Sequence, residues 1–213
     1  DKIGTDAQQL YLLGDLFDVW MEYKRAVPKG GVRFLGKLAE LSDAGIDLIL
    51  FTGNHDLWMH GYLEDELGAR VYKAPQTFQL GSHRFHVGHG DGLIPEEKSY
   101  LRLKNLFHHP LSQFLYRQLH PDTGLKLADY FSRLGPKHKY QELQLKPLEQ
   151  EYQWIYASRY LQEAAVDYFI FGHRHIPYDL SLREGSRILN TGDWISYDTY
   201  VAYDGTDCSL RKN

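Results

Sequence analysis

The chain has 213 residues, of which 43% are hydrophobic and 14% aromatic, a composition that excludes wholesale disorder and allows one substantial core. A formal net charge of −4 argues against nucleic acid as a partner, and a single cysteine excludes an internal disulfide. No apolar segment reaches the roughly 20 residues that a membrane-spanning helix needs. We therefore expect one soluble domain over residues 1–213, folded in the reducing environment of the cytoplasm.

Short apolar segments alternate with helical patterns along most of the chain. Residues 32–44 carry leucine and phenylalanine at helical spacing and are followed by Gly45, and a second helix is expected over residues 151–165. Five apolar segments predict buried strands at residues 10–13, 47–52, 84–88, 168–171 and 187–190. This alternation is typical of an α/β protein.

The pattern changes between residues 95 and 150, where the sequence is helical, basic and rich in Leu, Phe and Tyr. We interpret this segment as an inserted helical cap with breaks at Pro110, Pro121, Gly124 and Gly135, and its later part, residues 135–147, as a mobile loop. Residues 98–139 have a net charge of +6, which leaves −10 for the remainder. Such a basic surface suits an anionic ligand or an anionic membrane, and an ordinary solvated helical face is an equally favoured alternative.

Four of the five predicted strands end in a glycine that polar residues follow. The motifs are GDLFD, GNHD, GHGD and GHRH, which begin at Gly14, Gly53, Gly88 and Gly172. Because the carboxyl ends of the strands in an open α/β sheet gather ligands at one edge, we expect these motifs to converge. One such motif alone is more often a turn, a cap or a buried histidine, but four in succession indicate a functional site.

The side chains in these motifs are suited to divalent metals. Asp15, Asn54, His89, His173 and His175 offer carboxylate, amide and imidazole ligands without sulfur. This mixed set suits two divalent ions, with manganese as the first expectation and iron or zinc as alternatives. Two ions that share a carboxylate lower the pKa of a water molecule enough to make it a nucleophile at neutral pH. Asp15 is the expected bridge between them.

The GNHD motif also contains candidate catalytic residues. His55 stands between Asn54 and Asp56, and an imidazole paired with a carboxylate suits a group that stabilises phosphoryl charge or protonates a leaving oxygen. We assign that role to His55 and expect Asp56 to orient it. The other seven histidines fit no ligand pattern as well as these residues do.

With these four motifs the chain resembles the calcineurin-like metallophosphoesterases over residues 14–193. The resemblance implies a four-layer α/β/β/α sandwich with a dinuclear metal centre. It also implies a role for each ligand: Asp15 bridges the two ions, one ion binds Asn54, His89 and His173, and the other binds His175.

A narrower resemblance is to the branch of this family that acts in the lipid A pathway. It rests on GDLFDVW, on HGDGL followed by Glu96, Glu97 and Tyr100, and on the helical insertion. It implies a bacterial enzyme that hydrolyses the pyrophosphate bond of UDP-2,3-diacylglucosamine to UMP and 2,3-diacylglucosamine 1-phosphate. Asn54, His55 and Glu97 would then contact this lipid nucleotide, and the insertion would shelter its acyl chains at the cytoplasmic face of the inner membrane.

Two departures from the family pattern matter. The opening D-x-H motif of the family is absent before Tyr11, and we expect an upstream strand that carries it in the natural protein. His55 stands where the lipid A branch has arginine, which makes the substrate less certain than the reaction class. The alternatives are a general phosphodiesterase or phosphatase acting on nucleotides or phosphoproteins, and a non-catalytic scaffold with the same fold.

Overall fold

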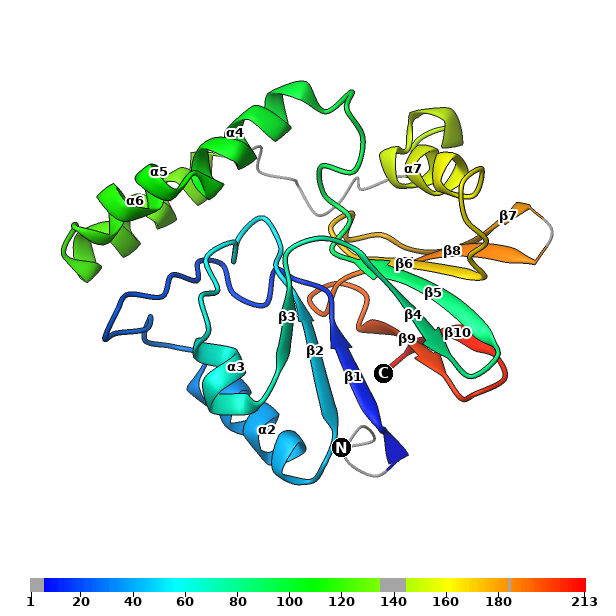
Figure 1. Cartoon of the computed structure of the whole chain (residues 1–213), viewed down its shortest axis with the longest axis horizontal. Helices are drawn as coiled ribbons and strands as arrows, with labels where there is room; N and C mark the ends of the chain where they lie inside the picture. The colour runs from blue at the N-terminus through cyan, green and yellow to red at the C-terminus, as the bar shows by residue number, and fades with distance from the viewer. Residues whose placement is uncertain (1–5, 135–144, 184) are drawn as a thin grey trace. The chain divides into compact units, whose positions relative to one another are not determined.

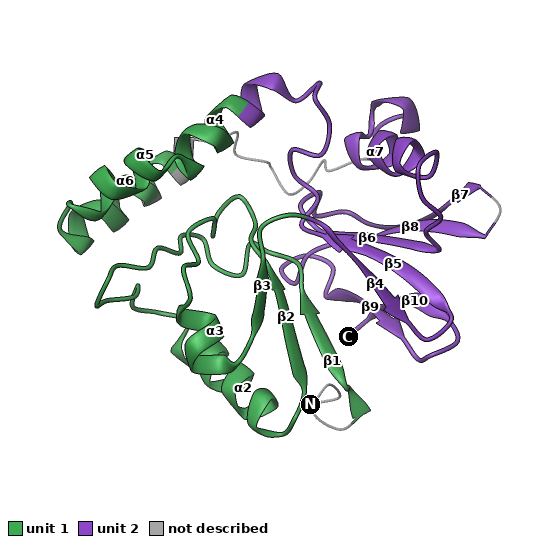
Figure 2. Ribbon diagram, in the orientation of Figure 1, with its two compact units in different colours: residues 1–74, 102–137 green, residues 75–101, 138–213 purple. Residues whose placement is uncertain are grey.

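A computed structural model describes residues 6–134, 145–183 and 185–213 (Figure 1). The chain, expected to form one domain, divides into two compact units (Figure 2). The first consists of residues 1–74 and 102–137, and the second consists of residues 75–101 and 138–213. Each unit has its own sheet and is described by itself. None of the helices in the described part of the chain is long and apolar enough to cross a membrane.

The first unit contains a three-stranded parallel sheet in the order β1-β2-β3. Its strands are β1 (Gln9–Leu12), β2 (Asp47–Phe51) and β3 (Arg70–Tyr72), and its first helices are α2 (Val32–Asp43) and α3 (Tyr62–Leu67). Helix α2 connects β1 to its parallel neighbour β2, which confirms the predicted strand–helix–strand unit. Both predicted strands of this unit are therefore present, whereas the short strand β3 was not predicted.

The core of the first unit lies between α2 and the sheet. Leu38 and Leu41 of α2 pack in one cluster with Leu48 and Leu50 of β2. Residues 48–51 of β2 are all buried, so both faces of this strand are covered, as is usual for a central parallel strand. A rigid central strand of this kind fixes the position of the loop that follows it.

The helical insertion predicted from the sequence contains three helices. They are α4 (Lys98–His108), α5 (Pro110–Arg117) and α6 (Pro121–Leu134). Pro110 and Pro121 begin helices, where a missing backbone N–H costs nothing. Within the first unit the indole N–H of Trp58 donates to the carbonyl of Phe107 at 3.0 Å, and its ring meets that of Tyr116 edge-on at 4.8 Å. The insertion therefore packs against the segment that follows GNHD.

The predicted break at Gly124 is wrong, because this glycine lies inside α6. A Cβ atom there would overlap the hydroxyl of Tyr23 and approach the ring of Tyr116. The glycine therefore permits close packing and does not end a helix. Gly135, and most of the loop predicted over residues 135–147, lie outside the described residues.

The second unit contains a five-stranded mixed sheet and a two-stranded antiparallel sheet. In spatial order the larger sheet has β4 (Gln76–Leu80), β5 (His83–Gly88), β6 (Tyr168–Phe171), β8 (Ser186–Thr191) and β7 (Pro177–Arg183). The smaller sheet pairs β9 (Thr199–Tyr203) with β10 (Cys208–Lys212). Strands β5, β6 and β8 are parallel and match the three remaining predicted strands, whereas the two edge strands are antiparallel.

Helix α7 (Tyr152–Tyr160) packs on this sheet after a short 3-10 turn, η1 (Leu148–Gln150). Ala157 of α7 packs in one core cluster with Phe169 and Phe171 of β6 and Ile188 of β8. The helix is shorter than the predicted span of residues 151–165. Beyond Tyr160 the backbone N–H groups bond within a tight turn that leads the chain into β6.

Candidate functional site

The loops after β1 and β2 are tied together in the first unit by one buried carboxylate. Asp56 is fully buried, and its Oδ1 accepts hydrogen bonds from the backbone N–H of Gly53 at 2.6 Å and of Asp15 at 3.2 Å. Its Oδ2 accepts from the backbone N–H of Leu16 at 2.8 Å. Charge-assisted bonds of this kind are stronger than neutral ones. Asp56 therefore joins the GDLFD and GNHD loops.

Asp15 is held tightly against the GNHD loop. Its backbone has a φ of 53°, a left-handed conformation that non-glycine residues rarely adopt. Its Oδ1 accepts a hydrogen bond from the backbone N–H of His55 at 2.9 Å. A Cβ atom on Gly53 would overlap both Oδ1 and the backbone nitrogen of Asp15. The glycine of GNHD is thus needed so that the carboxylate of Asp15 can approach this loop.

The ring of His55 has a partner that the sequence did not predict. Its Nδ1 lies 3.2 Å from the backbone carbonyl of Asp18, and the residue is exposed. Because a carbonyl only accepts, Nδ1 carries the proton in this contact. The carbonyl of Asp18 thus contacts the ring of His55, and the expected role of Asp56 in orienting that ring stays a prediction. Asn54, which directly precedes His55, is half-buried.

His89 and His173 lie side by side in the second unit. His89 follows β5 and is buried, and His173 follows β6 and is half-buried. Their ring centroids are 5.0 Å apart with the planes at 70°. The backbone N–H of Gly172 donates to the carbonyl of His89 at 2.9 Å, which ties the two loops at their base. The parallel pairing of β5 and β6 therefore brings two predicted ligands together.

The GHRH loop has an unusual backbone. His173 has a φ of 66° and His175 has a φ of 55°, so both imidazoles extend from left-handed residues. Each such residue costs on the order of 1–3 kcal/mol, and residues of this kind cluster at functional sites. Between them, Arg174 forms a two-pronged ion pair with the buried carboxylate of Glu151, at 3.0 Å from Nε and 2.9 Å from a terminal nitrogen. The loop is thereby anchored beside α7.

Asp193 is a site residue that the sequence analysis missed. Its Oδ1 accepts the backbone N–H groups of Ile195, Ser196 and Tyr197 at 3.1, 2.6 and 3.2 Å. Its Oδ2 lies 3.6 Å from Nδ1 of His175. The signal in the sequence was a fifth strand that ends in glycine and an acid, at Gly192 and Asp193.

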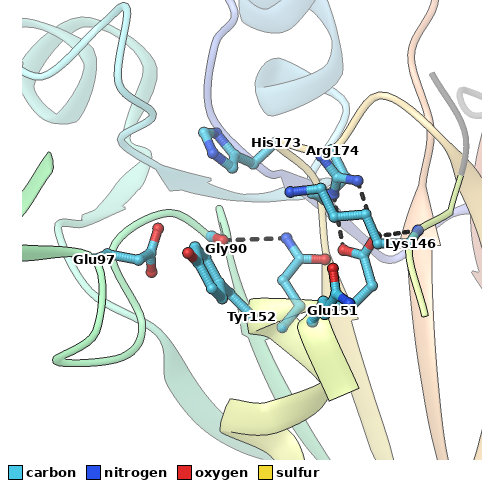
Figure 3. Close-up of a pocket in the computed structure, with 9 residues that line it drawn as sticks. Gly90, Glu97, Lys146, Glu151, Tyr152, His173 and Arg174 are labelled. Atoms are coloured by element: carbon cyan, nitrogen blue, oxygen red, sulfur yellow. Dashed lines mark hydrogen bonds and ion pairs between the residues drawn. The ribbon is translucent and has the colours of Figure 1, made fainter. Parts of the chain in front are cut away.

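A pocket lies beside His173 in the second unit (Figure 3). Its lining residues are Gly90, Glu97, Lys146, Gln150, Glu151, Tyr152, Gln153, His173 and Arg174. Glu97, a predicted substrate contact, is half-buried here, and burial raises the pKa of its carboxyl group. Its neighbour Glu96 is exposed and pairs with Arg159 at 2.7 Å.

The donor groups of each unit fit a divalent metal. The first unit presents the carboxylate of Asp15 with the amide of Asn54, and the second presents the imidazoles of His89, His173 and His175. Oxygen and imidazole nitrogen ligands suit Mn, Fe and Zn. In the second unit the rings of His89 and His173 lie side by side, and the carboxylate of Asp193 lies behind the ring of His175. This arrangement resembles a pre-formed set of metal ligands.

Residues 2–177 match the family model described as calcineurin-like phosphoesterase, and the chain belongs to this family of metal-dependent hydrolases. The predicted α/β metallophosphoesterase fold is confirmed, whereas the role of the helical insertion as a cap stays a prediction.

The chain is similar to a protein of Porphyromonas gingivalis named UDP-2,3-diacylglucosamine hydrolase, with 40% identity across all of this chain and 86% of that protein. A protein of the same name from Pseudomonas savastanoi pv. phaseolicola is 30% identical across 98% of this chain and 84% of that protein.

Proposed function

We propose that this protein is a bacterial enzyme of lipid A biosynthesis that hydrolyses the pyrophosphate bond of UDP-2,3-diacylglucosamine to UMP and 2,3-diacylglucosamine 1-phosphate. The observation that carries the proposal is the 40% identity to a UDP-2,3-diacylglucosamine hydrolase over the whole length of this chain. The GDLFD, GNHD, GHGD and GHRH motifs support it, because all four are present in the aligned region.

The same proposal includes two manganese ions bound by Asp15, Asn54, His89, His173 and His175. Bound divalent ions neutralise phosphate charge and lower the pKa of an attacking water molecule. The backbones of Asp15, His173 and His175 are left-handed, and this conformation costs free energy. Because strained residues of this kind cluster at functional sites, the strain supports the assignment.

His55 is the residue that we propose to act on the scissile phosphate. With Nδ1 protonated against the carbonyl of Asp18, Nε2 is the atom that would meet the substrate. In its protonated form this nitrogen stabilises negative charge on the phosphoryl oxygens or gives a proton to the oxygen of the leaving phosphate group. Asp56 supports it indirectly by fixing the GNHD loop, and Asn54 and Glu97 are the other proposed substrate contacts.

The lipid part of the substrate is assigned to the helical insertion. Among the side chains of α4, α5 and α6 that the structure describes, nine large apolar ones are exposed: Leu103, Leu106, Phe107, Leu111, Phe114, Leu115, Leu127, Tyr130 and Phe131. Arg102, Arg117 and Lys126 are exposed on the same helices. Apolar side chains flanked by cations suit acyl chains with anionic headgroups, so we propose that this surface also makes peripheral contact with the anionic inner membrane.

Substrate preference distinguishes this proposal from the alternative that the protein is a general phosphodiesterase. The histidine at position 55 favours that alternative. The ratio of kcat/KM values is measured for UDP-2,3-diacylglucosamine and for bis-p-nitrophenyl phosphate with the same manganese-loaded protein. The proposal predicts a strong preference for the lipid nucleotide. Cleavage of the simple ester without turnover of the lipid nucleotide would make the protein a general phosphodiesterase.

A further inference from the structure

We infer that Gln153 is a positioning residue that sets the spacing of the two proposed metal ligands His89 and His173. The inference deepens the proposed metal centre and rests on it. Gln153 lies in the first turn of α7 with only 1% of its surface exposed, and it is neither a proposed metal ligand nor a proposed catalytic residue.

The amide nitrogen of Gln153 joins the two histidine loops. Its Nε2 donates to the carbonyl of Gly90 at 3.1 Å and to the carbonyl of Gly172 at 2.9 Å. Gly90 directly follows His89, and Gly172 directly precedes His173. One side chain therefore grips the backbone one residue away from each ligand, and Figure 3 shows the bond to Gly90 as a dashed line.

The amide oxygen of Gln153 fixes the orientation of this grip. It accepts a hydrogen bond from the hydroxyl of Tyr178 at 2.6 Å and another from Nδ2 of Asn190 at 3.0 Å. Nδ2 of Asn190 also reaches the carbonyl of Gly172 at 2.5 Å. Both partners are buried donors, so the oxygen of Gln153 faces them and its nitrogen must face the two carbonyls.

The space around Gln153 is closed by the glycine of the GHGD loop. Gly90 has a φ of 102°, and a Cβ atom there would overlap Nε2 of Gln153. The close approach of loop and side chain thus depends on a residue without a side chain. A network in which one buried amide makes four hydrogen bonds is rigid, and rigid second-layer contacts are what hold metal ligands in register.

Gln153→Glu tests the inference with almost no change in volume, because it places an acceptor opposite the two loop carbonyls. Gln153→Met is the second variant, which keeps a similar length and removes both donors without adding charge. Tyr178→Phe is the matched control, because it removes one bond to the amide oxygen of Gln153 while the remaining bond from Asn190 keeps the amide nitrogen turned toward Gly90 and Gly172. Manganese affinity is measured by calorimetry without substrate, and the stability of the metal-free variants is measured by urea unfolding.

We expect Gln153→Glu and Gln153→Met to lower manganese affinity by about 10–100-fold, as is typical for residues that support metal ligands. Tyr178→Phe is expected to lose stability but to bind manganese within about threefold of the wild type. The inference is overturned if the Gln153 variants bind manganese as the wild type does, or if Tyr178→Phe loses as much affinity as they do. Because no lipid nucleotide is used, an error in the proposed substrate leaves this result unaffected.

Discussion

Oδ2 of Asp193 lies 3.6 Å from Nδ1 of His175, and the described residues offer neither of these buried atoms a hydrogen bond. The other oxygen of Asp193 is fixed by three backbone N–H groups, so the carboxylate cannot turn away. A histidine that binds a metal through Nε2 usually donates Nδ1–H to a carboxylate, and this pair has the arrangement for that contact. The relationship gives the GHRH loop a second layer of support, independent of Gln153.

Replacing Asp193 by asparagine is therefore expected to weaken metal binding more than folding. Asparagine keeps Oδ1 as an acceptor for the backbone, but its amide group is a donor and repels Nδ1–H of His175. We expect manganese affinity to fall by about tenfold or more, measured by calorimetry. Asp198→Asn is the control, because this exposed residue in the same loop has a φ of 52° that asparagine tolerates. Equal affinities for both variants would remove Asp193 from the metal centre.

Replacing Gly53 by alanine is expected to disable the first-unit half of the site. The new Cβ atom would overlap the carboxylate and backbone nitrogen of Asp15, so one of the two loops must move. We expect kcat to fall by at least about 100-fold, because a displacement near 1 Å in a catalytic site has effects of that size. Gly36→Ala, at an open position inside α2, should keep full activity and gain up to about 1 kcal/mol of stability. Wild-type activity in the Gly53 variant would contradict the placement of Asp15.

The buried ring of His86 predicts a loss of stability in acid. Burial lowers its pKa to about 4, and its two nitrogens lie 2.8 Å from the hydroxyl of Thr77 and 2.9 Å from that of Tyr156. Below its ordinary pKa of about 6.5, His86 is protonated in the unfolded chain, whereas in the folded chain it stays neutral until the pH falls to about 4. The stabilising effect is therefore complete above pH 6.5 and is lost as the pH falls toward 4.

We expect the free energy of unfolding to fall by about 2 kcal/mol between pH 7 and pH 5 because of this effect. Urea unfolding in the presence of a chelator measures this change. His86→Gln should be less stable at pH 7 and should lose correspondingly less stability on acidification. His120→Gln, at an exposed position, should keep the pH dependence of the wild type. If His86→Gln shows the same pH dependence as the wild type, another group must account for it.

The exposed aromatic residues of the insertion are expected to determine affinity for the lipid part of the substrate. Phe114 and Phe131 are 58% and 55% exposed, so replacing both by serine removes apolar surface with little loss of packing. We expect KM for UDP-2,3-diacylglucosamine to rise roughly tenfold, and sedimentation with phosphatidylglycerol vesicles to decrease. Turnover of bis-p-nitrophenyl phosphate should stay unchanged. Val32→Ser, at a 75% exposed apolar position on α2, is the control, and an equal effect there would show a nonspecific loss.

The elements predicted from the sequence are those whose local pattern determines their structure. Residues 48–51 form a continuous apolar segment bounded by turn signals, and such a segment is a buried strand in most contexts. Strand β7 (Pro177–Arg183) was missed because it begins with proline and mixes polar with apolar residues, as antiparallel edge strands do. Its pairing with β8 depends on a partner that a local pattern cannot show.

The site was predicted as a set of residue types, whereas the contacts among them required the structure. Asp15, His89 and His173 are recognisable because each follows a strand and a glycine. Asp56 and Gln153 hold loops that lie far away in the sequence, as the bonds of Asp56 to residues 15 and 16 show. A glutamine within an amphipathic helix ordinarily predicts an exposed residue, so the burial of Gln153 gave no local signal.

The products of the reaction test the central claim most directly. Manganese-loaded protein is incubated with UDP-2,3-diacylglucosamine, and the phosphorus NMR spectrum of the mixture is followed with time. The account predicts that the two pyrophosphate signals are replaced by two phosphomonoester signals, those of UMP and 2,3-diacylglucosamine 1-phosphate, and that a chelator stops this change. Formation of UDP, or an unchanged pyrophosphate spectrum in the metal-loaded protein, would contradict it.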